Sequence, residues 1–378
     1  MLNTYAMLTR ARALLVGVGL TACSFALAAE LTPANLNQEV SLPPGFSIEQ
    51  IAEVDNARAM AFGSEGTLFV SSMIPGNIYA VQGALEGEPR VIVLAKKLKL
   101  PTGVAFYNGD LYVADTSRIL RYADIEARLD SPGEPEVIAD GIPGGKLHGW
   151  KYIGFGPDGL LYVTVGAPCN VCNEPGTALI LRMAADGSGR EVFARGIRNT
   201  VGFDWHPQTD VLWFTENGRD GLGDEIPDDE LNSAPESGLD FGFPYCHGVD
   251  VIEPDKALAE LGSCAQSRPP ALALGAHVAP LGIVFYTGSQ FPAEYRGQAF
   301  IAQHGSWNRS QKTGYRLSLV RFSDPQTPVS HEVFASGWLV GEEVRGRPAD
   351  VIGAPDGSLL VSDDRRGAIY RISYSDNR

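Results

Sequence analysis

The chain has 378 residues, 44% of them hydrophobic, and a formal net charge of -15. This much apolar material is sufficient for a sizeable core, and the 43 glycines indicate many turns and argue against a helix-rich fold. The negative charge argues against nucleic acid as a partner, and it allows an anionic ligand only where arginines are concentrated at one place.

Residues 1–29 have the features of an export signal. Arg10 and Arg12 precede an apolar run at residues 13–22, and small residues follow this run. The run is too short to cross a membrane, and no other window approaches ~18 uninterrupted apolar residues. We therefore expect a periplasmic or secreted protein without a transmembrane segment.

Two processing sites fit the end of this signal. Residues 26–28 suit an ordinary signal peptidase, whereas residues 20–23 resemble a lipoprotein box in which Cys23 would be acylated. The apolar stretch continues past Cys23, which favours the first site. A lipid anchor through Cys23 remains the alternative.

One short pattern occurs six times along the rest of the chain. It consists of an apolar strand, a turn of the Pro-Asp-Gly or Asn-Gly type, and a second strand with alternating apolar residues. A hairpin of this kind cannot bury its own apolar face, so the six units must stack on one another. Their spacing of about 40 to 80 residues is typical of propeller blades with inserts. The units begin near residues 59, 103, 153, 201, 282 and 351.

We therefore predict an all-β protein, a single six-bladed β-propeller over residues 30–378. A β-sandwich or two smaller β domains would explain the alternation, but not a turn placed identically in each unit. An acidic, turn-rich insertion is expected at residues 221–279, between the fourth and fifth blades. Loops on a rigid scaffold often carry the functional site.

Four cysteines lie beyond the signal, and an even number in an exported chain indicates disulfides. Their order along the chain pairs Cys169 with Cys172 and Cys246 with Cys264. Zinc is the alternative for the first pair, although no second close pair completes four ligands. Asn173 follows Cys172 where a haem-attachment motif needs histidine, which excludes that motif.

A candidate catalytic residue lies in residues 146–151, directly before the third unit. His148 could act as a general base, because the pKa of a histidine is close to the working pH of most enzymes. The alternative is a structural or surface histidine, which is the commoner role among the six in this chain.

Two arginine-containing segments precede later units. Arg198 and Asn199 could hold a carboxylate through a planar guanidinium and an amide. Arg345 and Arg347 would project from one face if their segment is extended, and two like charges then call for an anion between them. The alternatives are an ion pair between blades for the first segment and ordinary surface arginines for the second.

The run at residues 215–232 combines glycines, amides and acids. Carboxylates, together with backbone carbonyls released by glycine turns, are ligands that suit calcium. The spacing does not match an EF-hand, and a solvated acidic loop is the alternative reading.

Together these segments resemble the soluble glucose dehydrogenase and sorbosone dehydrogenase family of pyrroloquinoline quinone (PQQ) enzymes, over about residues 40 to 373. The resemblance rests on the order of several short motifs and on their placement relative to the repeated units. Residues 166–172, 242–248 and 303–309 are closer to the sorbosone branch than to the glucose branch. The motifs are His148 with residues 154–159, residues 198–199, residues 215–219, residues 229–232, and residues 345–347 with Asp350.

The resemblance implies a six-bladed propeller and a defined set of roles. His148 would take the proton of a substrate hydroxyl while hydride passes to the quinone. The backbone carbonyls of Gly218 and Arg219 would bind a calcium ion in contact with PQQ. The carboxylates and quinone oxygens of the cofactor would be held by Arg198, Asn199, Arg345 and Arg347.

Some positions depart from the glucose branch. Leu147 and Ala167 replace two acids near the base, so its carboxylate partner must come from elsewhere, with residues 221–250 as the candidate source. The glucose branch also supplies a lysine from its fifth blade, for which His304, Asn308 and Arg309 are the candidate replacements. These departures argue against glucose as the substrate.

The leading hypothesis is therefore PQQ-dependent oxidation of an aldose or of a sugar aldehyde of the sorbosone type, with calcium. The electrons would leave to a separate acceptor, since no haem module follows the sixth unit. The alternatives are a calcium-dependent hydrolase similar to sugar lactonases, and a propeller that only presents a binding face.

Overall fold

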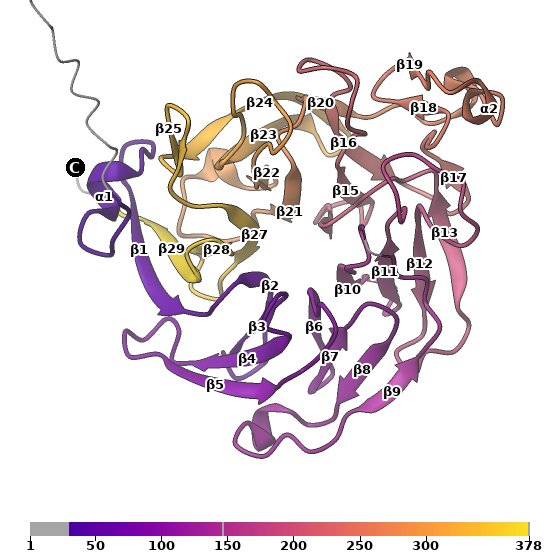
Figure 1. Ribbon diagram of the computed structural model, residues 1–378. Helices are drawn as coiled ribbons and strands as arrows, with labels where there is room; N and C mark the ends of the chain where they lie inside the picture. The colour runs from indigo at the N-terminus through magenta and orange to yellow at the C-terminus, as the bar shows by residue number, and fades with distance from the viewer. Residues whose placement is uncertain (1–29, 146, 377–378) are drawn as a thin grey trace, which may run out of the picture.

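The computed structural model describes residues 30–145 and 147–376. Six sheets form a ring, each built on four antiparallel strands, with their first strands nearest the centre (Figure 1). This arrangement confirms the predicted six-bladed β-propeller. The export signal and Cys23 lie outside the described residues. Within those residues, no helix is both long and apolar enough to cross a membrane.

The first three blades follow one another along the chain. The first blade contains β2 (Ala57–Phe62), β3 (Leu68–Ser72), β4 (Asn77–Gln82) and β5 (Arg90–Ala95). The second contains β6 (Gly103–Tyr107), β7 (Asp110–Ala114), β8 (Ile119–Tyr122) and β9 (Glu136–Ala139). The third contains β10 (Ile153–Phe155), β11 (Leu161–Val165), β12 (Leu179–Met183) and β13 (Glu191–Arg195).

The last three blades are less uniform. The fourth contains β14 (Phe203–Trp205), β15 (Leu212–Glu216), β16 (Asp229–Ala234) and β20 (Leu272–Gly275). The fifth contains β21 (Pro280–Phe285), β22 (Ala299–Gln303), β23 (Arg316–Asp324) and β24 (Thr327–Ser336). The sixth contains β27 (Pro348–Gly353), β28 (Leu359–Asp363), β29 (Ala368–Tyr374) and β1 (Phe46–Glu53).

The repeated turn has a local physical cause. In the third blade the Asp158 carboxylate accepts a hydrogen bond from the Leu160 amide at 3.1 Å, and Gly159 adopts φ = 74°. In the sixth blade Asp356 and Gly357 repeat this arrangement, with φ = 86° at the glycine. Aspartate closes such a turn with its side chain, and glycine occupies the left-handed region at little cost.

The ring closes through strand β1, which comes from the N-terminal end of the described chain. It pairs with β29 in antiparallel register, with Phe46 opposite Tyr374 and Ile48 opposite Ile372. The outermost strand of the sixth blade is therefore supplied by the opposite end of the chain (Figure 1). This pairing joins the first and last segments into one sheet.

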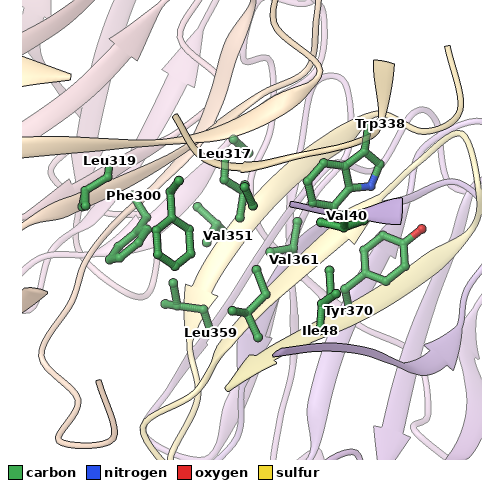
Figure 2. Close-up of a cluster of buried hydrophobic side chains, with 14 of the residues drawn as sticks. Val40, Ile48, Phe300, Leu317, Leu319, Trp338, Val351, Leu359, Val361 and Tyr370 are labelled. Atoms are coloured by element: carbon green, nitrogen blue, oxygen red, sulfur yellow. The ribbon is translucent and has the colours of Figure 1, made fainter. Parts of the chain in front are cut away.

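The blades are held together by apolar side chains packed between neighbouring sheets. Trp338 and Phe300 are fully buried in the largest of these clusters, which joins the fifth and sixth blades to β1. Burying a large apolar side chain contributes roughly 1.5–3 kcal/mol, so clusters of this size stabilise the ring. Figure 2 labels Val40, Ile48, Phe300, Leu317, Leu319, Trp338, Val351, Leu359, Val361 and Tyr370.

The predicted insertion at residues 221–279 is not a single segment between two blades. It contains β16 and β20, which are strands of the fourth blade, and the inserted residues 235–271 lie between them. Because β16 contains acidic and amide residues, the sequence did not indicate a strand there, although all six of its residues are buried. The polar side chains of β16 form buried hydrogen bonds, and they do not belong to a solvated loop.

The inserted residues reach the outer edge of the third blade. Within them, β17 (Leu239–Asp240) pairs in parallel with β13. A small hairpin follows, formed by β18 (Cys246–His247) and β19 (Val251–Ile252), and then α2 (Lys256–Ala259) and the 3₁₀ turn Cys264–Gln266. The Cys246–Cys264 disulfide closes this segment, as predicted.

Few other elements lie outside the blades. Helix α1 (Leu36–Glu39) precedes β1, and a short hairpin of β25 (Leu339–Val340) and β26 (Glu343–Val344) precedes the sixth blade. The remaining 3₁₀ turns are Glu126–Arg128 and Ala293–Tyr295.

Candidate active site

A cavity of about 370 Å³ lies on one face of the ring, where strand ends from several blades meet. Most of its lining residues lie either before or at the start of the first strand of a blade, or just after the second strand, and Asp229 begins a third strand. In an antiparallel pair the start of the first strand and the end of the second strand lie side by side, at the same end of the two strands. The first, third, fourth, fifth and sixth blades all contribute, so residues distant in the sequence converge there. A cavity of this volume can enclose a small cofactor.

His148 lines this cavity, and a backbone group orients its ring. The Nδ1 atom lies 2.7 Å from the Ala167 carbonyl oxygen. Because that oxygen only accepts, Nδ1 must carry the hydrogen, which leaves the Nε2 lone pair available. Burial, together with the nearby charge of Arg198, lowers the pKa of His148 to about 4. The ring is therefore neutral near pH 7 and able to accept a proton.

Local backbone structure permits this placement of His148. The residue adopts φ = 48°, and Gly166 lies so close that an added Cβ would be 2.6 Å from the His148 Cβ. Glycine is therefore required at position 166. The His148 ring is held by the carbonyl of Ala167, and not by the carboxylate that was expected from residues 221–250.

Arg198 also lines the cavity, and Asn170 holds its guanidinium. The Arg198 Nε donates to the Asn170 carbonyl at 2.8 Å, and Nη2 donates to the Asn170 side-chain oxygen at 3.0 Å. Nη1 donates to the Asn217 carbonyl at 3.0 Å, and Asp220 lies 3.3 Å from Nη2. The Arg198 side chain thus joins the third-blade loop to residues 217–220.

Asn170 lies inside the predicted Cys169–Cys172 disulfide loop, which the structure confirms. Besides its contacts with Arg198, its side chain accepts from the Asp220 amide at 2.9 Å and donates to the Asp220 carbonyl at 2.9 Å. Sequence reasoning did not single out Asn170. Its position between two bridged cysteines was the available signal.

Asn199, the neighbour of Arg198, is 6% exposed and lines the cavity. Its carbonyl accepts from the Asn217 backbone amide at 3.1 Å and from the Asn217 side chain at 3.2 Å. The backbone of Asn199 therefore helps to fix residue 217, next to the predicted calcium ligands.

The structure separates Arg345 from Arg347. Arg347 lines the cavity, where Nε donates to the His304 carbonyl at 3.1 Å and Nη2 donates to the Gly305 carbonyl at 2.8 Å. Arg345 does not line it: its Nη2 lies 2.9 Å from the carboxylate of Glu39, and its side chain is 2% exposed. The two side chains do not share a face, contrary to expectation, because residues 345–347 lie between β26 and β27 and not within a strand.

Two cavity residues were missed entirely. Arg58, at the start of β2, donates from Nη1 to Asp364 at 2.7 Å. Asp364 also lies 3.0 Å from Nε2 of His304 through each of its oxygens. Arg58 lies at the start of the first strand of its blade, whereas Arg347 directly precedes the first strand of the sixth blade, and Asp364 directly follows a second strand, as His304 does. Neither residue lies in a local motif that marks it as part of a site.

The two predicted metal ligands are placed differently. Gly218 lines the cavity, and its amide donates to Asp229 at 2.7 Å. Arg219 does not line it, and its guanidinium pairs with Glu253 of the inserted segment. Among the described residues there is no group of three His, Cys, Asp or Glu side chains that could hold a metal ion. A cation here would therefore depend on backbone carbonyls and on oxygens of a ligand.

Asp229 connects two loops of the cavity wall. One of its oxygens accepts from Gly218, and the other accepts from the Ala279 amide at 2.8 Å. Burial raises the pKa of Asp229 to about 6, although both hydrogen bonds act in the opposite direction. Its geometry indicates a role in positioning the residue 217–220 loop.

The sequence profile described as "Glucose / Sorbosone dehydrogenase" matches residues 113–371, which is more than half of the chain. The chain belongs to the glucose/sorbosone dehydrogenase family. An uncharacterized protein of Borreliella burgdorferi is 32% identical over 370 residues, covering 93% of this chain and 94% of that protein. Membership of the family confirms the resemblance noted in the sequence.

Two solved structures extend the comparison. The holo form of the pyranose dehydrogenase PQQ domain from Coprinopsis cinerea has a TM-score of 0.72 at 17% identity, over 88% of this chain and 97% of that chain. The calcium structure of the Trichoderma reesei family AA12 carbohydrate-active enzyme has a TM-score of 0.73 at 19% identity, over 92% and 99%. At these identities the likeness concerns the fold.

Proposed function

We propose that this member of the family is a quinoprotein that oxidises an aldose or a sorbosone-like sugar aldehyde, using PQQ and calcium. The observation that carries the proposal is the free Nε2 of His148 in a cavity that three arginines also line. PQQ and calcium appear in the descriptions of the two similar structures. We further propose that the protein acts in the periplasm or is secreted, and that a separate carrier accepts the electrons.

The donors of the cavity fit a cofactor with several carboxylates. Arg347 provides the clearest contact, because no carboxylate of the described chain forms an ion pair with it, and its Nε and Nη2 only donate to carbonyls. Arg58 and Arg198 each have an aspartate partner and add further donors. Arg58, Arg198, Asn199 and Arg347 would hold the cofactor, and Arg345 has no part in it.

The calcium site would be built around the backbone of Gly218 and Arg219. Residues 217–220 are fixed by Arg198, Asn170 and Asp229, so their carbonyls are held in place without a side-chain cage. An ion bound mainly by carbonyls needs an anionic partner, which the cofactor would supply. PQQ, when bound, supplies the two-electron acceptor for the hydride.

His148 would perform the proton transfer. Its Nε2 would take the proton of the substrate hydroxyl as the hydride leaves the adjacent carbon. The Ala167 carbonyl holds the ring in the productive tautomer, and burial keeps it unprotonated before the reaction. A positioned base of this kind contributes typically 10²–10⁴-fold to a rate.

A lactonase-like hydrolase would require carboxylate and amide ligands that converge on a metal ion. The cavity holds three arginines, which suit an anionic cofactor and have no role as metal ligands. The arginines therefore favour the dehydrogenase.

The test is reconstitution of the purified apoprotein. We expect dye-linked oxidation of aldoses or sugar aldehydes only when both PQQ and calcium are added, with bleaching of the bound quinone by substrate. His148→Gln should bind PQQ with unchanged affinity and fail to bleach it. Failure of the wild-type protein to bind PQQ in the presence of calcium would overturn the proposal, as would hydrolysis of lactones without PQQ.

A further inference from the structure

His304, Asp364 and Arg58 form a buried hydrogen-bonded cluster, in which the proposed function gives a role to Arg58 but none to His304 or Asp364. They come from the fifth, sixth and first blades and meet at the wall of the cavity. His304 Nε2 lies 3.0 Å from both oxygens of Asp364, and Arg58 Nη1 donates to Asp364 at 2.7 Å. The ring of His304 thus has one nitrogen engaged by a carboxylate.

The proton positions in this cluster follow from its contacts. Burial would raise the pKa of Asp364, but His304 and Arg58 hold it well below its usual range, so Asp364 is an anion. Its oxygens accept, which places the hydrogen of His304 on Nε2 and leaves Nδ1 without one in the neutral ring. Burial lowers the pKa of His304 to about 4; Asp364 opposes this, while Arg347 and Arg58 add to it. In the empty cavity His304 is therefore neutral.

The charges that line the cavity are balanced. Three arginines face three aspartates, namely Asp220, Asp229 and Asp364. A cofactor with three carboxylates brings three negative charges, of which a calcium ion offsets two. One negative charge is left in a low-dielectric site, where an uncompensated charge is costly.

The arrangement around His304 indicates where a compensating proton would go. Arg58 and Arg347 oppose its protonation in the empty cavity, and both are groups whose charge a bound anion would offset. Asp364 would then remain as the dominant charged neighbour, and a carboxylate stabilises an imidazolium. By contrast, His148 is held by the carbonyl of Ala167, and His277 is held by that of Gly223 at 2.8 Å.

We propose that His304 is a ligand of the anionic cofactor, and that the cofactor enters together with one proton that His304 takes up. The protonated ring would donate through Nε2 to Asp364 and through Nδ1 to an anionic oxygen. The inference rests on the proposed function, because it concerns binding of PQQ at the same cavity.

Isothermal titration of the apoprotein with PQQ at constant calcium tests this proposal. The apparent binding enthalpy is measured at pH 7 in buffers that differ in their ionisation enthalpy, which gives the number of protons taken up. We expect close to one proton per PQQ for the wild-type protein. The affinity should fall by up to about tenfold per pH unit between the pKa of His304 in the free protein and its pKa in the complex, and should level off at higher pH.

Variants assign the proton to its site. His304→Gln should bind with little proton uptake and with an affinity that varies little with pH. His304→Lys should restore the positive charge and the affinity, again without uptake. His148→Gln, in the same cavity, and His331→Gln, on the outer strand β24, are matched controls that should retain the full uptake.

The outcomes separate this inference from the proposed function. If the wild-type protein binds PQQ without taking up a proton, or if His304→Gln retains the uptake, the inference fails while the dehydrogenase proposal stands. If the wild-type protein does not bind PQQ, both fail. Thermal unfolding of each variant shows that it is folded, so that a loss of binding can be assigned to the cavity.

Discussion

The Nδ1 atom of His148 lies 2.7 Å from the carbonyl oxygen of Ala167, so a backbone group holds this imidazole where an acidic side chain was expected. A neutral partner does little to stabilise the protonated ring, and burial already lowers the pKa of His148 to about 4. The His148 ring should therefore be neutral at pH 7 and become protonated only in acid.

The first prediction follows from this pKa. The kcat/KM for sugar oxidation should be constant from about pH 6 to 8 and fall below about pH 5, as Nε2 gains a proton. His148→Gln should reduce kcat by about 10²–10⁴-fold. Steady-state rates across a pH series measure both effects. An activity that declines already between pH 8 and 6 would contradict the assignment of His148 as the base.

The second prediction compares the two arginines of residues 345–347. Arg347→Leu should raise the Kd for PQQ by roughly tenfold to a hundredfold, because it removes charge-assisted hydrogen bonds. Arg345→Leu should leave this Kd unchanged, because Arg345 pairs with Glu39 outside the cavity. The Arg345→Leu substitution should instead lower the Tm of the protein. Fluorescence titration with PQQ and thermal unfolding distinguish the pair, and equal losses of PQQ affinity would contradict the structure.

A third prediction concerns Asn170. Asn170→Ala removes the side-chain contacts to Arg198 and to the Asp220 backbone. We expect weaker binding of both PQQ and calcium, by several-fold to about tenfold, since each lost hydrogen bond contributes about 1 kcal/mol. Calcium-dependent PQQ titrations measure the change. Asn173→Ala, just beyond the bridged loop, is the matched control and should bind as the wild type does.

The fourth prediction links stability to pH through Asp350. This carboxylate accepts from the Met60 amide at 2.9 Å and from the Val351 amide at 3.0 Å, and so joins the first and sixth blades. Burial raises the pKa of Asp350 to about 7, although these bonds act against the shift. The folded state thus holds this proton more tightly than the unfolded state, whose pKa is ~3.9. Its contribution to stability is present at low pH and is lost as the pH rises towards 7.

Asp350→Asn removes this titration. Relative to the wild type, the free energy of unfolding of the variant should rise by on the order of 2 kcal/mol between pH 5 and 8. Denaturant unfolding of the apoprotein at the two pH values provides the measurement. Asp250→Asn, at an exposed residue, is the control. Its free energy of unfolding relative to the wild type should be the same at both pH values. A flat difference for Asp350→Asn as well would show that Asp350 is ionised throughout.

The sequence was sufficient for the fold because each blade repeats a local signal. The turn aspartates and glycines, such as Asp158 and Gly159, act over a few residues and can be recognised without knowledge of the tertiary structure. The two disulfides were predictable for a similar reason, since each joins cysteines that are neighbours along the chain.

The cavity was predictable only in part, because its partners come from distant segments. Arg58 and Asp364 are 306 residues apart, and neither has a local pattern that distinguishes it from a surface charge. The divergence of Arg345 from Arg347 depends on where β27 begins, a boundary that residue alternation does not define. The acidic strand β16 was misread as a loop because its polar groups are satisfied by neighbours that only the folded chain provides.

The pairing of β1 with β29 has a consequence for biogenesis. β1, the first strand of the described residues, finds its partner only when β29 has been made, so the nascent chain has no closed ring before that point. A truncation that removes β29 would leave β1 as an unpaired edge and the sixth blade without its two outer strands.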